Sequence, residues 1–266
     1  MNLLKPILYS ALAIGTALFA ASPNSEIFDV QVSYLLEKGG TITPTMFAFC
    51  PGGKWAYILA SGSNSVYVYD LSIPVLTDVT IPVGTTPVDI AITPDGLYAY
   101  VVNSGSNNLS IINLTTNTVT STISVGTNPQ GIAITPDGQY AYVVNAGDSS
   151  VCVIHLLSNT ITSTIPVGTS PYDIAITPNG AFAYVVNKGS NSISIINLNT
   201  NTVTSTIAVS SSPNAIAILR NGKTAFVAYA NSNTTSEIDL SNNSVSNPAV
   251  SMISSEVLQI LFQRNP

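Results

Sequence analysis

Charged side chains are scarce in this chain. Only 8% of its 266 residues are Asp, Glu, Lys or Arg, compared with about 25% in an average soluble protein. Serine, threonine and asparagine make up about a third of the chain, so we expect a neutral surface rich in hydroxyl and amide groups. The seven Lys and Arg residues are scattered and the net charge is −6, so the basic cluster that nucleic acid requires is missing. We expect no nucleic-acid partner.

Histidine and cysteine are also scarce, which limits the possible catalytic and metal chemistry. One histidine, His155, and two cysteines, Cys50 and Cys152, are too few to build a zinc site. No nucleophile elbow, His-x-x-x-His, Cys-x-x-Cys, phosphate-binding loop or EF-hand motif is present. The sequence therefore indicates no catalytic residue, no metal ligand set and no cofactor.

Repetition is the strongest feature of the sequence. The run from Pro87 to Asn103 reappears with few changes at 129–145 and 171–187. The copies begin at prolines spaced by 43, 42, 42 and 42 residues, which are Pro44, Pro87, Pro129, Pro171 and Pro213. This period, with several short strand-like segments per copy, is typical of β-propeller blades. We predict an all-β propeller with complete repeats at 44–86, 87–128, 129–170, 171–212 and 213–254.

Each repeat contains four candidate strands of about equal length. In the second repeat they are residues 89–93, 98–103, 109–114 and 118–125. The first places Ile90 and Ile92 on one face and the small Ala91 on the other, which suits the crowded inner end of a blade. The fourth alternates hydroxyl and apolar residues, and its counterparts contain Pro82 and Pro166. Proline is tolerated at sheet edges, so we place this strand outermost.

Two strand-like segments lie outside the five repeats, at 27–35 and 256–262. Because a propeller closes by building its last blade from both chain ends, we predict a sixth blade made of these two segments. Together they supply only two or three strands, so the closing blade is thin, or the chain is a fragment of a longer, open array.

The first 21 residues resemble a secretory signal peptide. Lys5 precedes an apolar run at 6–19, and Ala20 or Ala21 offers a small residue for cleavage. The run is shorter than the ~20 residues needed to span a bilayer. We therefore expect residues 1–21 to be removed, leaving a single propeller domain at 22–266 with no membrane span. The expected location is the periplasm, the cell surface or the medium.

Export permits disulfides, but the positions of the two cysteines argue against one. Cys50 falls on the first strand of the first repeat, and Cys152 on the third strand of the third repeat. Different strands of non-neighbouring blades lie farther apart than the ~7 Å that a disulfide tolerates between Cα atoms. We predict two free thiols.

The repeated segment Ile-Ala-Ile-Thr-Pro-Asp/Asn-Gly, followed by Tyr-Val-Val-Asn at 100–103, 142–145 and 184–187, resembles the repeat of YVTN-family β-propellers. The resemblance covers about residues 44–254. The first and last repeats depart from it, because Tyr57-Ile-Leu-Ala and Phe226-Val-Ala-Tyr replace the signature and Arg220 replaces the turn proline. The resemblance implies an exported or surface-layer propeller and no catalytic residue.

We call the set of equivalent positions in the five repeats a column. Most columns that hold polar residues are explained by backbone geometry. We expect the acidic or amide residue before each turn glycine to order that turn, at Asp95, Asp137, Asn179 and Asn221. The asparagine that ends each signature should order the following loop, at Asn103, Asn145 and Asn187. His155 occupies a column that holds Asp or Asn elsewhere, so we interpret it as a strand-end residue that bonds locally.

The variable columns are better candidates for binding. They lie one and two residues after each repeat's first proline, where we expect two sets of loops to meet at one mouth of the channel. The candidate ligand-binding residues are Asp89, Gln130, Tyr172, Asp173 and Asn214. A packing role for each of them remains the alternative.

We therefore predict a non-enzymatic scaffold that binds a protein or glycan at the cell envelope. The alternative is a lactonase-like or sugar-processing propeller hydrolase that holds a metal with carboxylates at the channel mouth. Only the equivalent positions of Asp89 and Asp173, two blades apart, favour that alternative.

Overall fold

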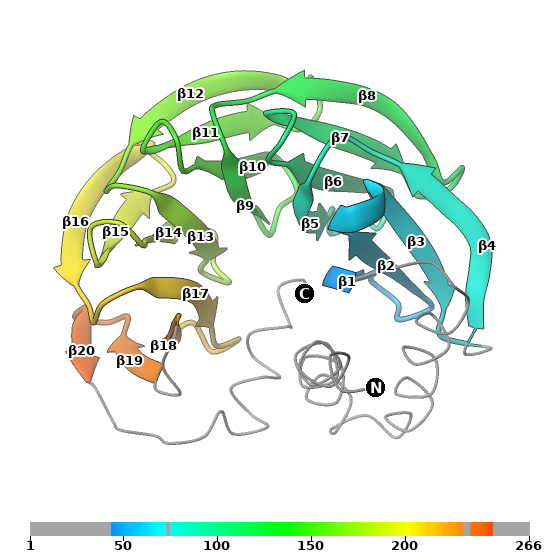
Figure 1. Ribbon diagram of the computed structural model, residues 1–266. Coiled ribbons are helices and arrows are strands. Elements are labelled where there is room, and N and C mark those ends of the chain that lie inside the picture. Colours follow the sequence, from blue (N-terminus) through cyan, green and yellow to red (C-terminus); the bar gives the residue numbers. More distant parts are fainter. Residues whose placement is uncertain (1–43, 73–74, 231–234, 247–266) are drawn as a thin grey trace, which may run out of the picture.

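The computed structural model describes residues 44–72, 75–230 and 235–246. It is a β-propeller in which five four-stranded antiparallel sheets, here called blades 1 to 5, fan out around a common axis (Figure 1). Each blade coincides with one sequence repeat, as predicted. The expected signal peptide and the two segments of the predicted sixth blade lie outside the described residues, so both stay predictions.

The first three strands have five or six residues in every blade, whereas the fourth varies from eight residues in blade 1 to three in blade 5. Blade 1 contains β1 (Pro44–Phe49), β2 (Trp55–Ala60), the 3-10 helix η1 (Ser61–Ser63), β3 (Ser65–Asp70) and β4 (Val75–Pro82). Blade 2 contains β5 (Pro87–Ile92), β6 (Tyr98–Asn103), β7 (Asn108–Asn113) and β8 (Thr118–Ser124). Blade 3 contains β9 (Pro129–Ile134), β10 (Tyr140–Asn145), β11 (Ser150–His155) and β12 (Thr160–Pro166). Blade 4 contains β13 (Pro171–Ile176), β14 (Phe182–Asn187), β15 (Ser192–Asn197) and β16 (Thr202–Ala208). Blade 5 contains β17 (Pro213–Ile218), β18 (Thr224–Tyr229), β19 (Thr235–Asp239) and β20 (Ser244–Ser246).

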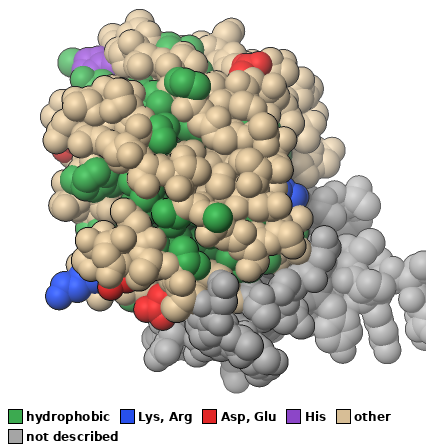
Figure 2. All heavy atoms as spheres, turned by 90° about the vertical axis from the view of Figure 1, so that its left-hand side faces the viewer, with side chains coloured by type: hydrophobic (Ala, Val, Ile, Leu, Met, Phe, Trp, Pro, Cys, Tyr) green, Lys and Arg blue, Asp and Glu red, His purple; other side chains and the backbone are tan. Residues whose placement is uncertain are grey.

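Every blade is a meander that runs outward from the axis. The first strands contact one another in the order β1, β5, β9, β13 and β17, and so form the inner wall. The fourth strand is outermost, as the prolines predicted, and Pro82 and Pro166 each lie at its end. Its Thr and Ser side chains are largely exposed. The face in Figure 2 accordingly shows few charged side chains.

The hydrophobic core lies between blades rather than within one. Ile90 and Ile92 of β5 pack toward blade 1, whereas Ala91 of the same strand packs toward blade 3. Alternating large and small side chains thus let neighbouring first strands approach closely near the axis. This confirms the two-faced inner strand expected from the sequence.

The loops gather at two ends of the channel. At one end, here called the loop end, the β6–β7 loop meets the connection from blade 1 to blade 2. Ser104 N–H donates to Thr86 O at 2.9 Å, and Gly105 N–H donates to Thr85 O at 3.0 Å. At the other end, here called the turn end, the β5–β6 and β7–β8 turns meet, where Leu114 N–H donates to Leu97 O at 2.9 Å. The predicted meeting of the two loop sets is confirmed.

Tyrosine–asparagine hydrogen bonds join successive blades at the turn end. In each of blades 1 to 4, the tyrosine at the third position of the second strand donates to an asparagine in the turn before the next blade's fourth strand, at 2.7 to 2.9 Å. The pairs are Tyr57–Asn117, Tyr100–Asn159, Tyr142–Asn201 and Tyr184–Asn243. Burial raises the pKa of Tyr100 and Tyr142 to about 12, so both hydroxyls stay protonated at neutral pH. Blade 5 has Phe226 in this column and cannot donate such a bond.

Both cysteines are free, as predicted. Within the described ranges, no helix is long and apolar enough to cross a membrane.

Candidate functional site

A β-bulge at the start of each first strand separates the two variable positions. In blade 4, Pro171 lies opposite Asn187 and Asp173 lies opposite Val186, which leaves Tyr172 without a partner in the ladder. The same shift occurs in the other four blades. A bulge redirects the side chain of the extra residue. As a result, Tyr172 is 39% exposed and Asp173 only 4% exposed.

The two candidate aspartates connect blades through backbone hydrogen bonds. The Oδ1 atom of Asp89 accepts from the N–H of Ile90, and its Oδ2 atom accepts from the N–H of Ile132 in blade 3, both at 2.9 Å. Asp173 repeats this arrangement with Ile174 at 2.7 Å and Ile216 of blade 5 at 2.8 Å. The structure therefore gives Asp89 and Asp173 a packing role, which was the alternative left open by the sequence.

This geometry explains why the aspartates occur in alternate blades. Each carboxylate accepts one amide hydrogen bond from its own blade and one from the next. The amide of Ile132 in blade 3 is therefore already bonded to Asp89, and blade 3 has Gly131 where blades 2 and 4 have aspartate. A Cβ atom on Gly131 would lie 3.1 Å from Tyr172 O and 3.3 Å from Asp173 Cα, so a larger side chain would strain the contact with blade 4. The variation in this column thus reflects pairwise packing.

The other three candidates lie at the loop end of three successive blades. Tyr172 is the most exposed, and Lys188 Nζ lies 4.7 Å from the centroid of its ring, a cation–π contact. Gln130 is half-buried and its Nε2 donates to Asn128 Oδ1 at 2.7 Å. Asn214 is half-buried, and its Oδ1 has no hydrogen-bond partner among the described residues. Tyr172 is therefore the candidate most available to a ligand.

The constant polar columns have structural roles, as predicted. The Asp95 Oδ1 atom accepts from Leu97 N–H at 2.9 Å and from the Thr93 hydroxyl at 2.5 Å, and so orders the turn. Asn103 is fully buried, and its Nδ2 donates to Asn108 and Ser110. His155 makes a local contact between Nδ1 and the hydroxyl of Ser158 at 2.9 Å.

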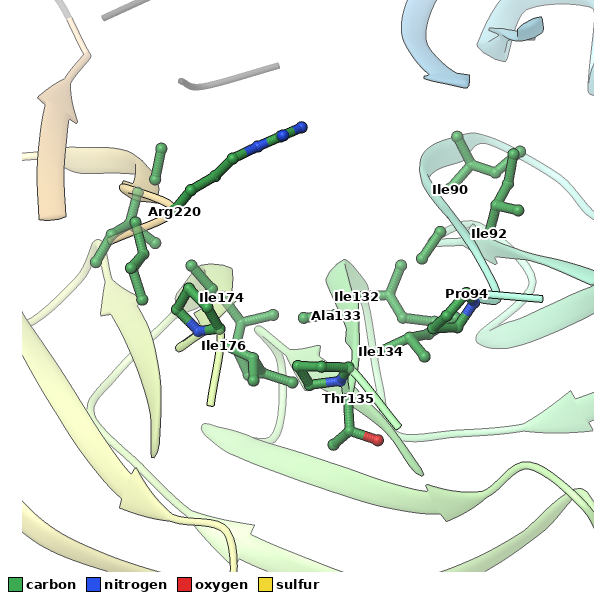
Figure 3. Close-up of a pocket in the computed structure, with 17 residues that line it drawn as sticks. Ile90, Ile92, Pro94, Ile132, Ala133, Ile134, Thr135, Ile174, Ile176 and Arg220 are labelled. Atoms are coloured by element: carbon green, nitrogen blue, oxygen red, sulfur yellow. The ribbon is translucent and has the colours of Figure 1, made fainter. Parts of the chain in front are cut away.

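A second candidate site lies inside the channel, toward the turn end. A cavity of about 270 Å³ is enclosed by the first strands of blades 2 to 5 (Figure 3). Its wall repeats an Ile-Ala-Ile motif once per blade and continues into the turn residues Pro94, Pro136 and Pro178. Such a wall offers apolar surface and few polar groups. It suits a hydrophobic ligand rather than acid–base chemistry.

Among the described residues that line this cavity, Arg220 is the single charged one. It occupies the turn position held by proline in blades 2 to 4, and its side chain is exposed and extended in Figure 3. Within the described ranges, Arg220 has no ion pair and the acidic and histidine residues form no group that could hold a metal. In the described part of the chain, the turn end thus combines an apolar cavity with an adjoining arginine that has no ion pair.

The cavity is not apparent in the sequence, because its wall is formed by nearly constant positions of the repeat and not by the variable ones. The Ile-Ala-Ile motif is nearly constant and was assigned to packing, which is correct for the side chains that face neighbouring blades. The departure of Arg220 from proline was the one signal in the sequence that distinguished this position.

The architecture and its channel define the protein as a β-propeller of the repeat type. A family model described as "YNCE-like beta-propeller" matches residues 32–253, and the chain belongs to this family. No curated protein matches the chain significantly.

Among solved structures, hydrazine synthase of Kuenenia stuttgartiensis is 23% identical with a TM-score of 0.73, over 79% of this chain and 67% of that one. A protein of unknown function from Desulfotomaculum acetoxidans is 20% identical with a TM-score of 0.70, over 79% and 70%. A candidate 6-phosphogluconolactonase from Bacteroides uniformis is 15% identical with a TM-score of 0.66, over 77% and 70%. Identities this low support the common fold alone.

Proposed function

We propose that the protein is an exported, non-enzymatic β-propeller that binds a glycan or protein of the cell envelope at its loop end. The observation that carries the proposal is Tyr172, an exposed aromatic ring held by a β-bulge on a rigid strand with Lys188 beside it. Aromatic rings that combine apolar area with a polar tip recur at binding surfaces. The surrounding surface of hydroxyl and amide groups suits a neutral polar partner such as a saccharide.

The competing hydrolase proposal depends on Asp89 and Asp173 as metal ligands at the channel mouth. Both carboxylates are nearly fully buried and each accepts hydrogen bonds from two backbone amides in different blades. At 3% and 4% exposure, the two side chains offer a metal ion little access from the channel mouth, and their desolvation would add to the cost of binding one. This cost favours the binding proposal over the hydrolase.

A saccharide array tests the glycan form of the proposal. We expect the purified chain to bind envelope-type saccharides, and Tyr172→Ala to weaken binding about three- to tenfold, because a stacked aromatic ring contributes roughly 0.5–1.5 kcal/mol. Tyr98→Ala is the matched control, since Tyr98 is similarly exposed at 37% but begins β6 at the turn end. Equal losses in the two variants would refute a site at Tyr172.

Cell fractionation tests the export part of the proposal. A tagged full-length chain should be recovered outside the cytoplasm and shortened by about two kilodaltons, as expected from loss of a signal peptide of the usual size. A cytoplasmic product of full length would contradict export.

A further inference from the structure

The turn end of the channel has the chemistry of a lipid-like ligand site. First-strand residues of four blades line the cavity, and its volume of about 270 Å³ is near the lower end of ligand pockets. Its accessible apolar surface comes mainly from the half-buried Ile134, Ile176 and Ile218, because the earlier isoleucine of each strand is packed between blades. In Figure 3, Ile132, Ile134, Ile174 and Ile176 lie along the wall on the side away from Arg220's guanidinium. A short aliphatic chain would fill such a space and leave its polar head at the mouth.

The charged residues of the turns around the mouth differ between blades. The turns of blades 2 and 3 carry Asp95 and Asp137, whereas the equivalent residues of blades 4 and 5 are the neutral Asn179 and Asn221. Arg220 and Lys223 both belong to the blade 5 turn, and the only other cation at an equivalent turn position of the described blades, Lys54 of blade 1, lies over the ring of Trp55. An anionic head is therefore attracted to the blade 5 side, and the two aspartates penalise a second negative charge.

The guanidinium group of Arg220 has no protein partner within the described ranges, although it adjoins the cavity. Arginine presents a planar set of donors that matches a carboxylate in a bidentate pair. Proline in the same turn of blades 2, 3 and 4 shows that the fold itself does not require a cation here.

We infer that the turn end of the channel binds a medium-chain aliphatic carboxylate, with the chain against the isoleucine wall and the carboxylate on Arg220. This site is separate from the loop end and does not depend on the proposed function there. Binding involves no covalent step.

The experiment is isothermal titration of the purified chain with decanoate, 1-decanol, decyl phosphate and decyltrimethylammonium. Wild-type protein should bind decanoate at one site, and the cationic analogue at least about tenfold more weakly. Arg220→Pro restores the residue of the other blades and should keep or raise the melting temperature, because no backbone hydrogen bond from Arg220 N–H is lost. This variant should bind decanoate at least about tenfold more weakly but bind 1-decanol unchanged, since one charge-assisted pair contributes at least this factor.

Two matched variants complete the design. Lys223→Gln removes the neighbouring cation, which contributes to the local charge but does not line the cavity, and should weaken decanoate binding by no more than about threefold, far less than Arg220→Pro. Tyr172→Ala should also leave decanoate binding unchanged, which separates this site from the loop end. The inference is overturned if wild-type protein does not bind decanoate, if decyl phosphate binds more tightly, or if folded Arg220→Pro retains wild-type affinity.

Discussion

Replacing Asp173 with alanine is expected to lower the free energy of unfolding by about 3 kcal/mol, because two buried amide donors lose a charged acceptor. These are the N–H groups of Ile174 in blade 4 and Ile216 in blade 5. For a domain of this size the melting temperature should fall by about 6 to 12 °C. Asp173→Asn should recover only part of the loss, since its amide nitrogen cannot accept a hydrogen bond.

Asp137→Ala is the matched control for this variant. Asp137 also accepts a backbone hydrogen bond, from Gln139 N–H at 3.0 Å, but it is exposed and acts within one turn. We expect it to lower the free energy of unfolding by about 1 kcal/mol or less. Chemical denaturation of both variants gives the comparison, and equal losses would contradict an inter-blade role for Asp173.

Replacing Ile196 with alanine should cost about 2–5 kcal/mol, the usual range for truncating a fully buried isoleucine. Ile196 of β15 has no exposed surface and packs in the cluster between blades 3 and 4, with Val153 and Val185. This interface lacks an aspartate from blade 3, because Gly131 occupies that position. It therefore depends more on apolar packing than its neighbours do.

Ile161→Ala controls for the chemistry of the substitution. Ile161 lies on the outermost strand β12 and is 42% exposed, so its truncation should change stability by about 0.5 kcal/mol at most. Repeat proteins are stabilised by coupling between neighbours, so Ile196→Ala should also broaden the unfolding transition. A loss below about 1 kcal/mol for Ile196→Ala would show that the blades do not depend on this cluster.

The sequence predicted the blade almost residue by residue because its signals are local and are repeated five times. The second strand was expected at 98–103 and β6 spans Tyr98–Asn103. The other boundaries in this blade differ by one or two residues, since the first strand begins at Pro87 before the bulge. The turn at Thr93–Gly96 was equally predictable, and the hydrogen bond from Gly96 N–H to Thr93 O at 2.8 Å confirms it.

The candidate site was less predictable, because its hydrogen bonds join residues of different blades. A carboxylate that accepts hydrogen bonds from amides 1 and 43 residues away leaves no pattern within one repeat. The alternation of Asp89, Gly131 and Asp173 therefore looks like functional variation until the blades are placed side by side. The bulge that exposes Tyr172 while burying Asp173 is likewise invisible in the alternation of side chains.

The faces at the two ends of the blade series also differ. Blade 1 carries an apolar cluster on β1 to β3, which includes Phe47, Ile58 and Tyr69. In blade 5, Thr235 and Glu237 occupy the columns that hold Leu109 and Ile111 in blade 2. A more polar face is typical of terminal repeats. Whether residues 27–35 and 256–262 complete a sixth blade stays a prediction.

Asp89 and Asp173 join neighbouring blades through buried hydrogen bonds, and we propose that this is their role in place of metal binding. The most direct test is the melting temperature of the wild type and of the Asp89→Ala/Asp173→Ala variant, each with excess calcium and with EDTA. We expect the same melting temperature for the wild type in calcium and in EDTA, and an equally lowered value for the variant in both. A calcium-dependent rise in the wild type that disappears in the variant would contradict it and favour the metal-dependent hydrolase.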